Sequence, residues 1–172
     1  MTSINRKVIT ENILKLIDSN GIEDSDFANL IEKSTRTLSR IRKGQSLFNI
    51  DAINVASSFF EKSLIELNNQ DIVIETDSRN KLKHIHKNNV AYSILLEKRP
   101  SITYAIIYYL LNNKEFCSKG MIVDKIKKFF ESLGWNYSSS YISSSMTRNS
   151  KYIAIAGTDI VDGNEVNVYK SK

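Results

Sequence analysis

The spacing of apolar residues along this chain changes once. From about residue 6 to residue 149, apart from a polar stretch at 68–88, apolar residues recur mostly at intervals of three and four, which predicts a succession of amphipathic helices. After residue 150 the interval becomes two, in "YIAIAG" and "NEVNVYK", and the Asp162-Gly163 pair between these stretches is typical of a tight hairpin turn. The chain is therefore expected to be mainly α-helical, with one β-hairpin near its C-terminal end.

Five short helices are predicted within residues 1–67. Polar residues that favour helix starts and glycines that favour helix ends separate the apolar groups. The first helix covers residues 6–19, and the last is a short one around residues 64–67. The residues expected to begin or end the helices between them are Gly21, Ser25, Ser34, Gly44 and either Asn49 or Asp51. Five helices in so few residues predict a compact all-α domain.

The third of these helices has an unusual composition. In "STRTLSRIRKG", from Ser34 to Gly44, only Leu38 and Ile41 are apolar, and the other side chains are mostly cationic or hydroxylated. Two residues three apart make a much narrower apolar stripe than most helices of a globular domain use. The pattern indicates a helix that two residues hold in place and that presents its other faces to a partner.

Residues 9–67 resemble the helix-turn-helix domain of the lambda-repressor and Cro-like (XRE) family of bacterial and phage regulators. Phe27-Ala28 matches the family's Leu-Ala pair on the second helix, and Ser34 matches the cap of the recognition helix. The other matching positions are Leu38, Ile41, Gly44, Ile53, Ala56, Phe60 and Leu67. The resemblance implies a repressor-like domain that binds double-stranded DNA.

The resemblance also implies roles for single residues. The helix at 34–43 would lie in the major groove, where Thr35, Arg36 and Arg40 would face the bases and each arginine could donate two hydrogen bonds to a guanine. The residues implied as contacts to the DNA backbone are Ser34, Thr37, Ser39, Arg42, Lys43 and Gln45. Because one such domain makes few base contacts, the resemblance implies a homodimer on a palindromic site.

Two departures from the family pattern keep an alternative open. Glu32 stands where a turn glycine is usual. Glu23, Asp24 and Asp26 stand at the start of the second helix, where the family often has a residue that meets a phosphate, and acids would repel one. The alternative is a protein-interaction module, antitoxin-like or partner-binding, that keeps the helix-turn-helix shape while DNA binding is secondary.

The rest of the chain is predicted as a linker and a second module. Residues 68–88 are polar apart from "IVI" and are interpreted as a linker with a short extended piece at 72–75. Residues 89–172 begin with a helix at 89–98 that must end before Pro100. Three further helices and the hairpin follow, and that order of elements resembles a winged helix.

The role of this winged-helix-like module stays open between dimerisation and a second DNA contact. Its serine-rich helix at 138–149 would be the recognition helix, and Ser139, Ser143 and Arg148 are the residues that could contact DNA. The expected hairpin carries acids that phosphate would disfavour, which are Asp159, Asp162 and Glu165.

Nothing in the sequence indicates an enzyme. No nucleophile motif or phosphate-cradling glycine loop is present, and we expect no cofactor. The two histidines, His84 and His86, lie in the predicted linker without further metal ligands nearby, so we expect no metal site. A single cysteine, the lack of a secretory signal and the lack of a long apolar run predict a cytoplasmic protein with no membrane contact. The net charge of +5 suits a polyanion without requiring one, and whether a small-molecule effector binds stays open.

Overall fold

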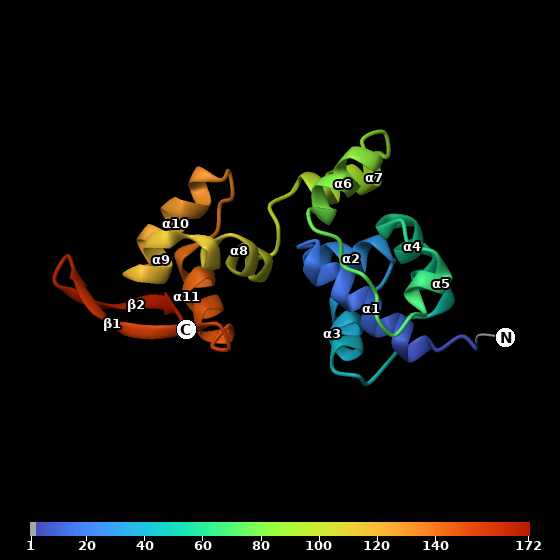
Figure 1. Cartoon of the computed structure of the whole chain (residues 1–172), viewed down its shortest axis with the longest axis horizontal. Coiled ribbons are helices and arrows are strands. Elements are labelled where there is room, and N and C mark those ends of the chain that lie inside the picture. The colour runs from blue at the N-terminus through green and yellow to red at the C-terminus, as the bar shows by residue number, and fades with distance from the viewer. Residues whose placement is uncertain (1–2) are drawn as a thin grey trace. The chain divides into compact units, whose positions relative to one another are not determined.

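The computed structural model describes residues 3–172 of the chain (Figure 1). Within that range the protein is mainly helical, with eleven α-helices and one two-stranded antiparallel hairpin close to the C-terminus. The change in apolar spacing predicted this combination, and the prediction is confirmed. The chain divides into two compact units, Met1–Lys98 and Arg99–Lys172, and each has its own hydrophobic core.

Seven helices form the first unit, and the first five lie where the sequence predicted them. The seven are α1 (Arg6–Ser19), α2 (Asp24–Leu30), α3 (Thr35–Arg42), α4 (Ile50–Phe60), α5 (Leu64–Leu67), α6 (Ser78–Ile85) and α7 (Val90–Glu97). The side chains of Ser34 and Asn49 each accept a backbone N–H bond of 3.1 Å and so cap α3 and α4. The start of α2 differs from the prediction, because its N-cap is Glu23 and not Ser25.

The core of the first unit combines aliphatic side chains with four buried phenylalanines. The ring of Phe27 stacks on that of Phe60 at 5.9 Å and meets that of Phe48 edge-on at 6.0 Å. Ala28 from α2 and Leu38 from α3 belong to the same buried cluster, and both are fully buried. The small side chain of Ala28 therefore lies inside the core that joins the first helices.

The predicted linker over residues 68–88 is wrong in its second half. Residues 78–85 form α6, which turns Leu82 into the core of the first unit. The side chain of His86, at the end of α6, is buried as well. The short piece at 72–75 pairs with no other strand. The sequence did not predict this helix, because its residues are mostly polar and only a few of them contact the core.

The domain boundary predicted at residue 88 is also wrong, because the first unit ends at Lys98. Leu96 of α7 is fully buried in the first unit, and the ring of Tyr92 lies edge-on to that of Phe59 at 5.1 Å. Figure 1 shows α6 and α7 as a helical hairpin at the end of this unit. The helix expected at 89–98 therefore exists as α7, but it belongs to the first unit, which ends at Lys98.

A buried arginine fastens this helical hairpin. The guanidinium of Arg79 donates to the carbonyls of Asn20 and Gly21 after α1, at 2.5 and 3.2 Å. It also donates to the carbonyls of Leu96 and Lys98 at the end of α7, at 2.8 and 2.7 Å. Because helix ends leave carbonyls without intrahelical partners, the cation of Arg79 satisfies acceptors at two helix C-termini at once.

The second unit contains four α-helices followed by the hairpin. Its elements are α8 (Ile102–Tyr108), the 3₁₀ turn η1 (Leu110–Asn112), α9 (Lys114–Ser118), α10 (Val123–Ser132), α11 (Ser139–Arg148), β1 (Ile153–Val161) and β2 (Asn164–Ser171). The three predicted helices correspond to α8, α10 and α11, whereas α9 was not predicted. The largest fully buried side chain here is that of Tyr137, whose hydroxyl donates to the Pro100 carbonyl at 2.7 Å.

The hairpin is connected as its turn residues predicted. Asp162 and Gly163 both have positive φ, 50° and 78°, as a two-residue hairpin turn requires. Its second strand also pairs outside the hairpin, because Met121 and Tyr169 exchange backbone hydrogen bonds of 2.8 and 2.9 Å. Gly120 precedes that bridge with φ of 79°, and a Cβ there would lie 2.9 Å from the Tyr169 carbonyl oxygen. Only glycine fits at this close approach.

Candidate nucleic-acid interface

The exposed face of α3 is the strongest candidate for a binding surface. Within the helix only Leu38 and Ile41 are buried, at 0% and 4% exposure, and they point into the core of the first unit. The side chains of Thr35, Arg36 and Arg40 are exposed. The narrow apolar stripe predicted from the sequence is therefore confirmed, and the remaining surface of α3 is cationic and hydroxylated.

Arg36 and Arg40 are the two cations that this face leaves available. They stand four residues apart on one helix, so their side chains project from the same side. Neither forms an ion pair with any residue in the range 3–172. An arginine without a carboxylate partner keeps all its donors for a ligand, and two of them four residues apart suit an anionic or hydrogen-bond-accepting partner.

The hydroxyls at the start of α3 are already used in its cap. The backbone N–H of Thr37 donates to Ser34 Oγ at 3.1 Å, and the two hydroxyl oxygens lie 3.0 Å apart. This cap fixes the first turn of α3, from which Thr35 and Arg36 project. Ser34 and Thr37, implied as DNA-backbone contacts, thus also have an intramolecular role.

Arg42 differs from the other arginines of α3. Its guanidinium donates to both carboxylate oxygens of Asp24, at 2.6 and 2.7 Å, and to the carboxylate of Asp18, at 2.8 and 3.3 Å. Burial lowers the pKa of this guanidinium, but the hydrogen bonds and charges of Asp24 and Asp18 outweigh burial and raise it overall. Arg42 therefore ties α3 to α1 and α2, and its charge is balanced within the chain.

Two acids at the start of α2 form ion pairs, although the sequence predicted that these acids would repel a phosphate. Asp24 is paired with Arg42, and Asp26 is paired with Lys98 at 2.6 Å. The side chain of Asp26 is only 18% exposed. Two of the three acids expected to repel a phosphate therefore face cations of the same unit. Sequence reasoning missed these pairs because their partners lie 18 and 72 residues away.

The end of α3 presents further polar groups. Ser39, Lys43 and Gln45 are exposed, and Lys43 forms no ion pair within the described range. The chain turns at Gly44, whose φ is 71°, and the N–H of Gln45 donates to the Arg40 carbonyl at 2.9 Å. These three polar side chains are therefore accessible around the C-terminal end of α3.

The second candidate surface, on α11, is much less cationic. Arg148 folds back on its own helix: it donates to Ser145 Oγ at 2.9 Å and lies 5.7 Å from the centre of the Tyr141 ring. Ser139 is exposed on the first turn, whereas Ser143 is half-buried and faces the hairpin. The three residues predicted here therefore do not form one surface.

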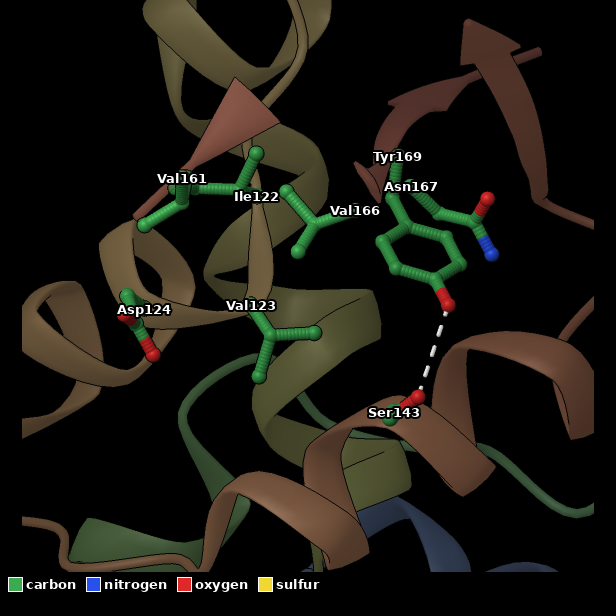
Figure 2. A pocket seen from close by; sticks show the side chains of 8 residues that line it. All are labelled: Ile122, Val123, Asp124, Ser143, Val161, Val166, Asn167 and Tyr169. Carbon is green, nitrogen blue, oxygen red and sulfur yellow. Dashed lines mark hydrogen bonds between the residues drawn. The ribbon is translucent and has the colours of Figure 1, made fainter. Parts of the chain in front are cut away.

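A pocket of about 220 Å³ separates α10 and α11 from the hairpin. Figure 2 shows the hydroxyls of Ser143 and Tyr169 joined on one side of it, at 3.5 Å, and aliphatic side chains on the other. The aliphatic lining consists of Ile122, Val123, Val161 and Val166. Asp124 and Asn167 complete the lining. The pocket is mainly apolar, and no cation lines it, so it does not suit a phosphate.

The hairpin beside α11 is acidic. Asp159, Asp162 and Glu165 are exposed around its turn, and no lysine or arginine occurs between Tyr152 and Tyr169. The three acids expected to disfavour phosphate are therefore on the surface, where their charges act. The turn end of the hairpin therefore offers a DNA phosphate little attraction.

No candidate metal cluster and no membrane-spanning helix occurs among residues 3–172. No group of three or more His, Cys, Asp or Glu side chains within residues 3–172 could hold a metal ion. His84 is exposed, while His86 is buried with Nε2 2.8 Å from the Phe59 carbonyl, so the two side chains point to different surroundings. None of the described helices combines the length and apolar character needed to cross a bilayer.

No family model, no curated protein and no solved structure matches this chain.

Proposed function

We propose that this protein is a sequence-specific DNA-binding transcriptional regulator of the cytoplasm. In this proposal α2 and α3 form a repressor-like helix-turn-helix, α3 enters the major groove, and two copies bind a palindromic site. The observation that carries the proposal is the exposed face of α3, where Arg36 and Arg40 have no carboxylate partner among the described residues while Leu38 and Ile41 hold the helix in place.

The distribution of charge supports the same reading. Asp24 and Asp26 are balanced by Arg42 and Lys98, so the acids near α3 oppose a phosphate less than their number suggests. Thr35 and Arg36 would contact bases from the first turn, and Arg40 from the second. Ser39, Lys43 and Gln45 would contact the backbone, with Ser34 and Thr37 near it. Arg42 would act mainly by positioning α3.

We further propose that the second unit is a winged helix that contacts protein and not DNA. The order α10, α11, β1, β2 and the bridge between Met121 and Tyr169 support the winged-helix assignment. The folded-back Arg148 and the acidic hairpin favour the protein-contact role over a second DNA contact.

The test begins with selection of bound duplexes from a random pool. The affinity of the full chain for the selected duplex and for a scrambled one is then measured over a range of salt concentrations. A DNA-binding regulator should prefer the selected duplex and lose affinity steeply with salt. Equal, weak and salt-insensitive binding to both duplexes would instead identify the protein-interaction module.

Single substitutions locate the contact. Arg36→Ala and Arg40→Ala should each cost roughly 1–3 kcal/mol on the selected duplex and less on the scrambled one. Lys43→Ala should weaken both duplexes alike and reduce the salt slope by about 1. Arg148→Ala removes the same charge from the second unit and should change little. A loss for Arg148→Ala as large as for Arg36→Ala would show that α11 binds DNA.

A further inference from the structure

α7 has an apolar surface on both sides. Its inner side is fixed in the first unit by Leu96 and Tyr92. Its outer side carries Val90 and Ile94, which are 71% and 52% exposed, with the exposed Ala91 beside them. Val90 and Ile94 are four residues apart and so form one stripe along the helix. An eight-residue helix whose outward stripe is apolar leaves a surface that water solvates poorly.

The charges at the two ends of this stripe are opposite. Lys87 stands in the turn before α7, is exposed, and forms no ion pair within residues 3–172. Glu97 ends α7 and is 70% exposed, with one long contact of 3.7 Å to Lys83. The stripe between them carries no charge. A partner that matches it must be apolar in the centre, acidic opposite Lys87 and basic opposite Glu97.

We propose that α7 is a homodimer interface in which a second copy of this chain packs its own α7 antiparallel against the first. With the two-fold axis crossing the outer side of α7 midway between Val90 and Ile94, Val90 lies opposite the partner's Ile94. The same register places Lys87 opposite the partner's Glu97, and by symmetry each contact occurs twice. A parallel arrangement would instead place like charges together. The antiparallel copy is therefore the occupant that satisfies both the apolar stripe and its charged ends.

The contacts that hold α7 in the first unit suit such an interface. Arg79 holds the carbonyls of Leu96 and Lys98, and the Tyr92 ring lies between α7 and the core, so the helix does not have to order itself on binding. One helix face is smaller than the roughly 800 Å² per partner of a standard interface. The dimer is therefore weak in solution and is reinforced when two half-sites hold both copies on one DNA molecule.

The test is sedimentation of the full chain without DNA, from nanomolar to high micromolar concentration. The wild-type chain should pass from monomer to dimer within that range. Ile94→Asp should raise the dimer dissociation constant at least about tenfold, because it places a charge twice in an apolar contact. The control is Ile65→Asp on α5, which changes a side chain that is 83% exposed and should leave dimerisation unchanged.

A charge exchange tests the antiparallel register. Lys87→Glu and Glu97→Lys should each weaken the dimer, and the double variant should restore it. Thermal melting of every variant checks that the first unit remains folded. A wild-type chain that is monomeric throughout, a dimer that Ile65→Asp disrupts and Ile94→Asp does not, or a double variant without recovery would each overturn the proposal. DNA preference that depends on Arg36 would survive any of these results, so the two proposals fail separately.

Discussion

Replacing Glu32 by glycine should stabilise the first unit. Glu32 follows the last turn of α2 with φ of 54°, in the left-handed region. Its N–H donates to the Asn29 carbonyl at 3.1 Å, and the N–H of Lys33 donates to the Ala28 carbonyl at 2.9 Å. This pair of bonds is the Schellman pattern, in which glycine is the preferred residue at the left-handed position. The end of α3 has the same pattern, with Gly44 in that position.

The size of the effect follows from that backbone angle. A side chain in the left-handed region costs about 1–2 kcal/mol. Glycine recovers this cost but loses about 0.5–1 kcal/mol through its greater freedom in the unfolded chain. Glu32→Gly should therefore gain roughly 0.5–1 kcal/mol of unfolding free energy. Glu32→Gln keeps the Cβ and removes only the charge, so it should change stability by a few tenths at most. The reverse change, Gly44→Ala, should lose about 1 kcal/mol.

Urea unfolding followed by two signals measures the effect in the full chain. Far-ultraviolet circular dichroism reports both units, whereas the fluorescence of Trp135, the only tryptophan, reports the second unit. Glu32→Gly should move the dichroism transition to higher urea and leave the fluorescence transition in place. If Glu32→Gln stabilises as much as Glu32→Gly, charge and not backbone strain is responsible, and the reasoning is refuted.

Three further predictions concern the boundaries, the hairpin and a helix cap. A fragment of residues 1–98 should unfold cooperatively, whereas a fragment of residues 1–67 should be less stable by at least about 3 kcal/mol, because it lacks the buried leucines of α6 and α7; equal urea midpoints would contradict this. Gly120→Ala should destabilise the second unit by about 1–3 kcal/mol in the Trp135 fluorescence transition, since its Cβ would meet the Tyr169 carbonyl at 2.9 Å; an unchanged midpoint would show that the bridge adapts. The backbone N–H and the hydroxyl of Ser63 donate hydrogen bonds to the Glu66 carboxylate and hold its pKa below the ordinary value. The carboxylate therefore stabilises α5 at pH values above the pKa of Glu66 in the unfolded chain. This contribution is lost as the pH falls through the pKa of Glu66 in the folded chain. Ser63→Ala should raise that pKa in an NMR titration, and no change would mean that the hydroxyl does not contribute.

The first five helices could be predicted because their determinants are local. Ser34 caps α3 three residues from its partner, and Gly44 ends the same helix within one turn. The Asp162-Gly163 turn is equally local. Such features depend on residues close together in the sequence, so they can be predicted without knowledge of the tertiary structure.

The parts that were missed depend on residues far apart in the sequence. The sequence of α6 suggested a polar linker, because nothing near Arg79 in the chain indicates that it is buried. The carbonyls that accept its hydrogen bonds lie at the ends of other helices. Arg42 was interpreted as a backbone contact because Asp18 and Asp24, which balance it, are 24 and 18 residues away. For the candidate site, the sequence therefore identified which helix is exposed and which residues hold it. The sequence could not show which cations of α3 already form ion pairs within the chain.

The four carbonyl contacts of Arg79 have a kinetic consequence. They join α6 to residues 58 and 59 positions earlier in the chain and to residues 17 and 19 positions later. Contacts of such long sequence separation require α1, α6 and α7 to be in place before they can form. They are therefore expected after the rate-limiting step of folding and must break before the rate-limiting step of unfolding is crossed. Arg79 should accordingly set how long the first unit stays folded more than how fast it folds.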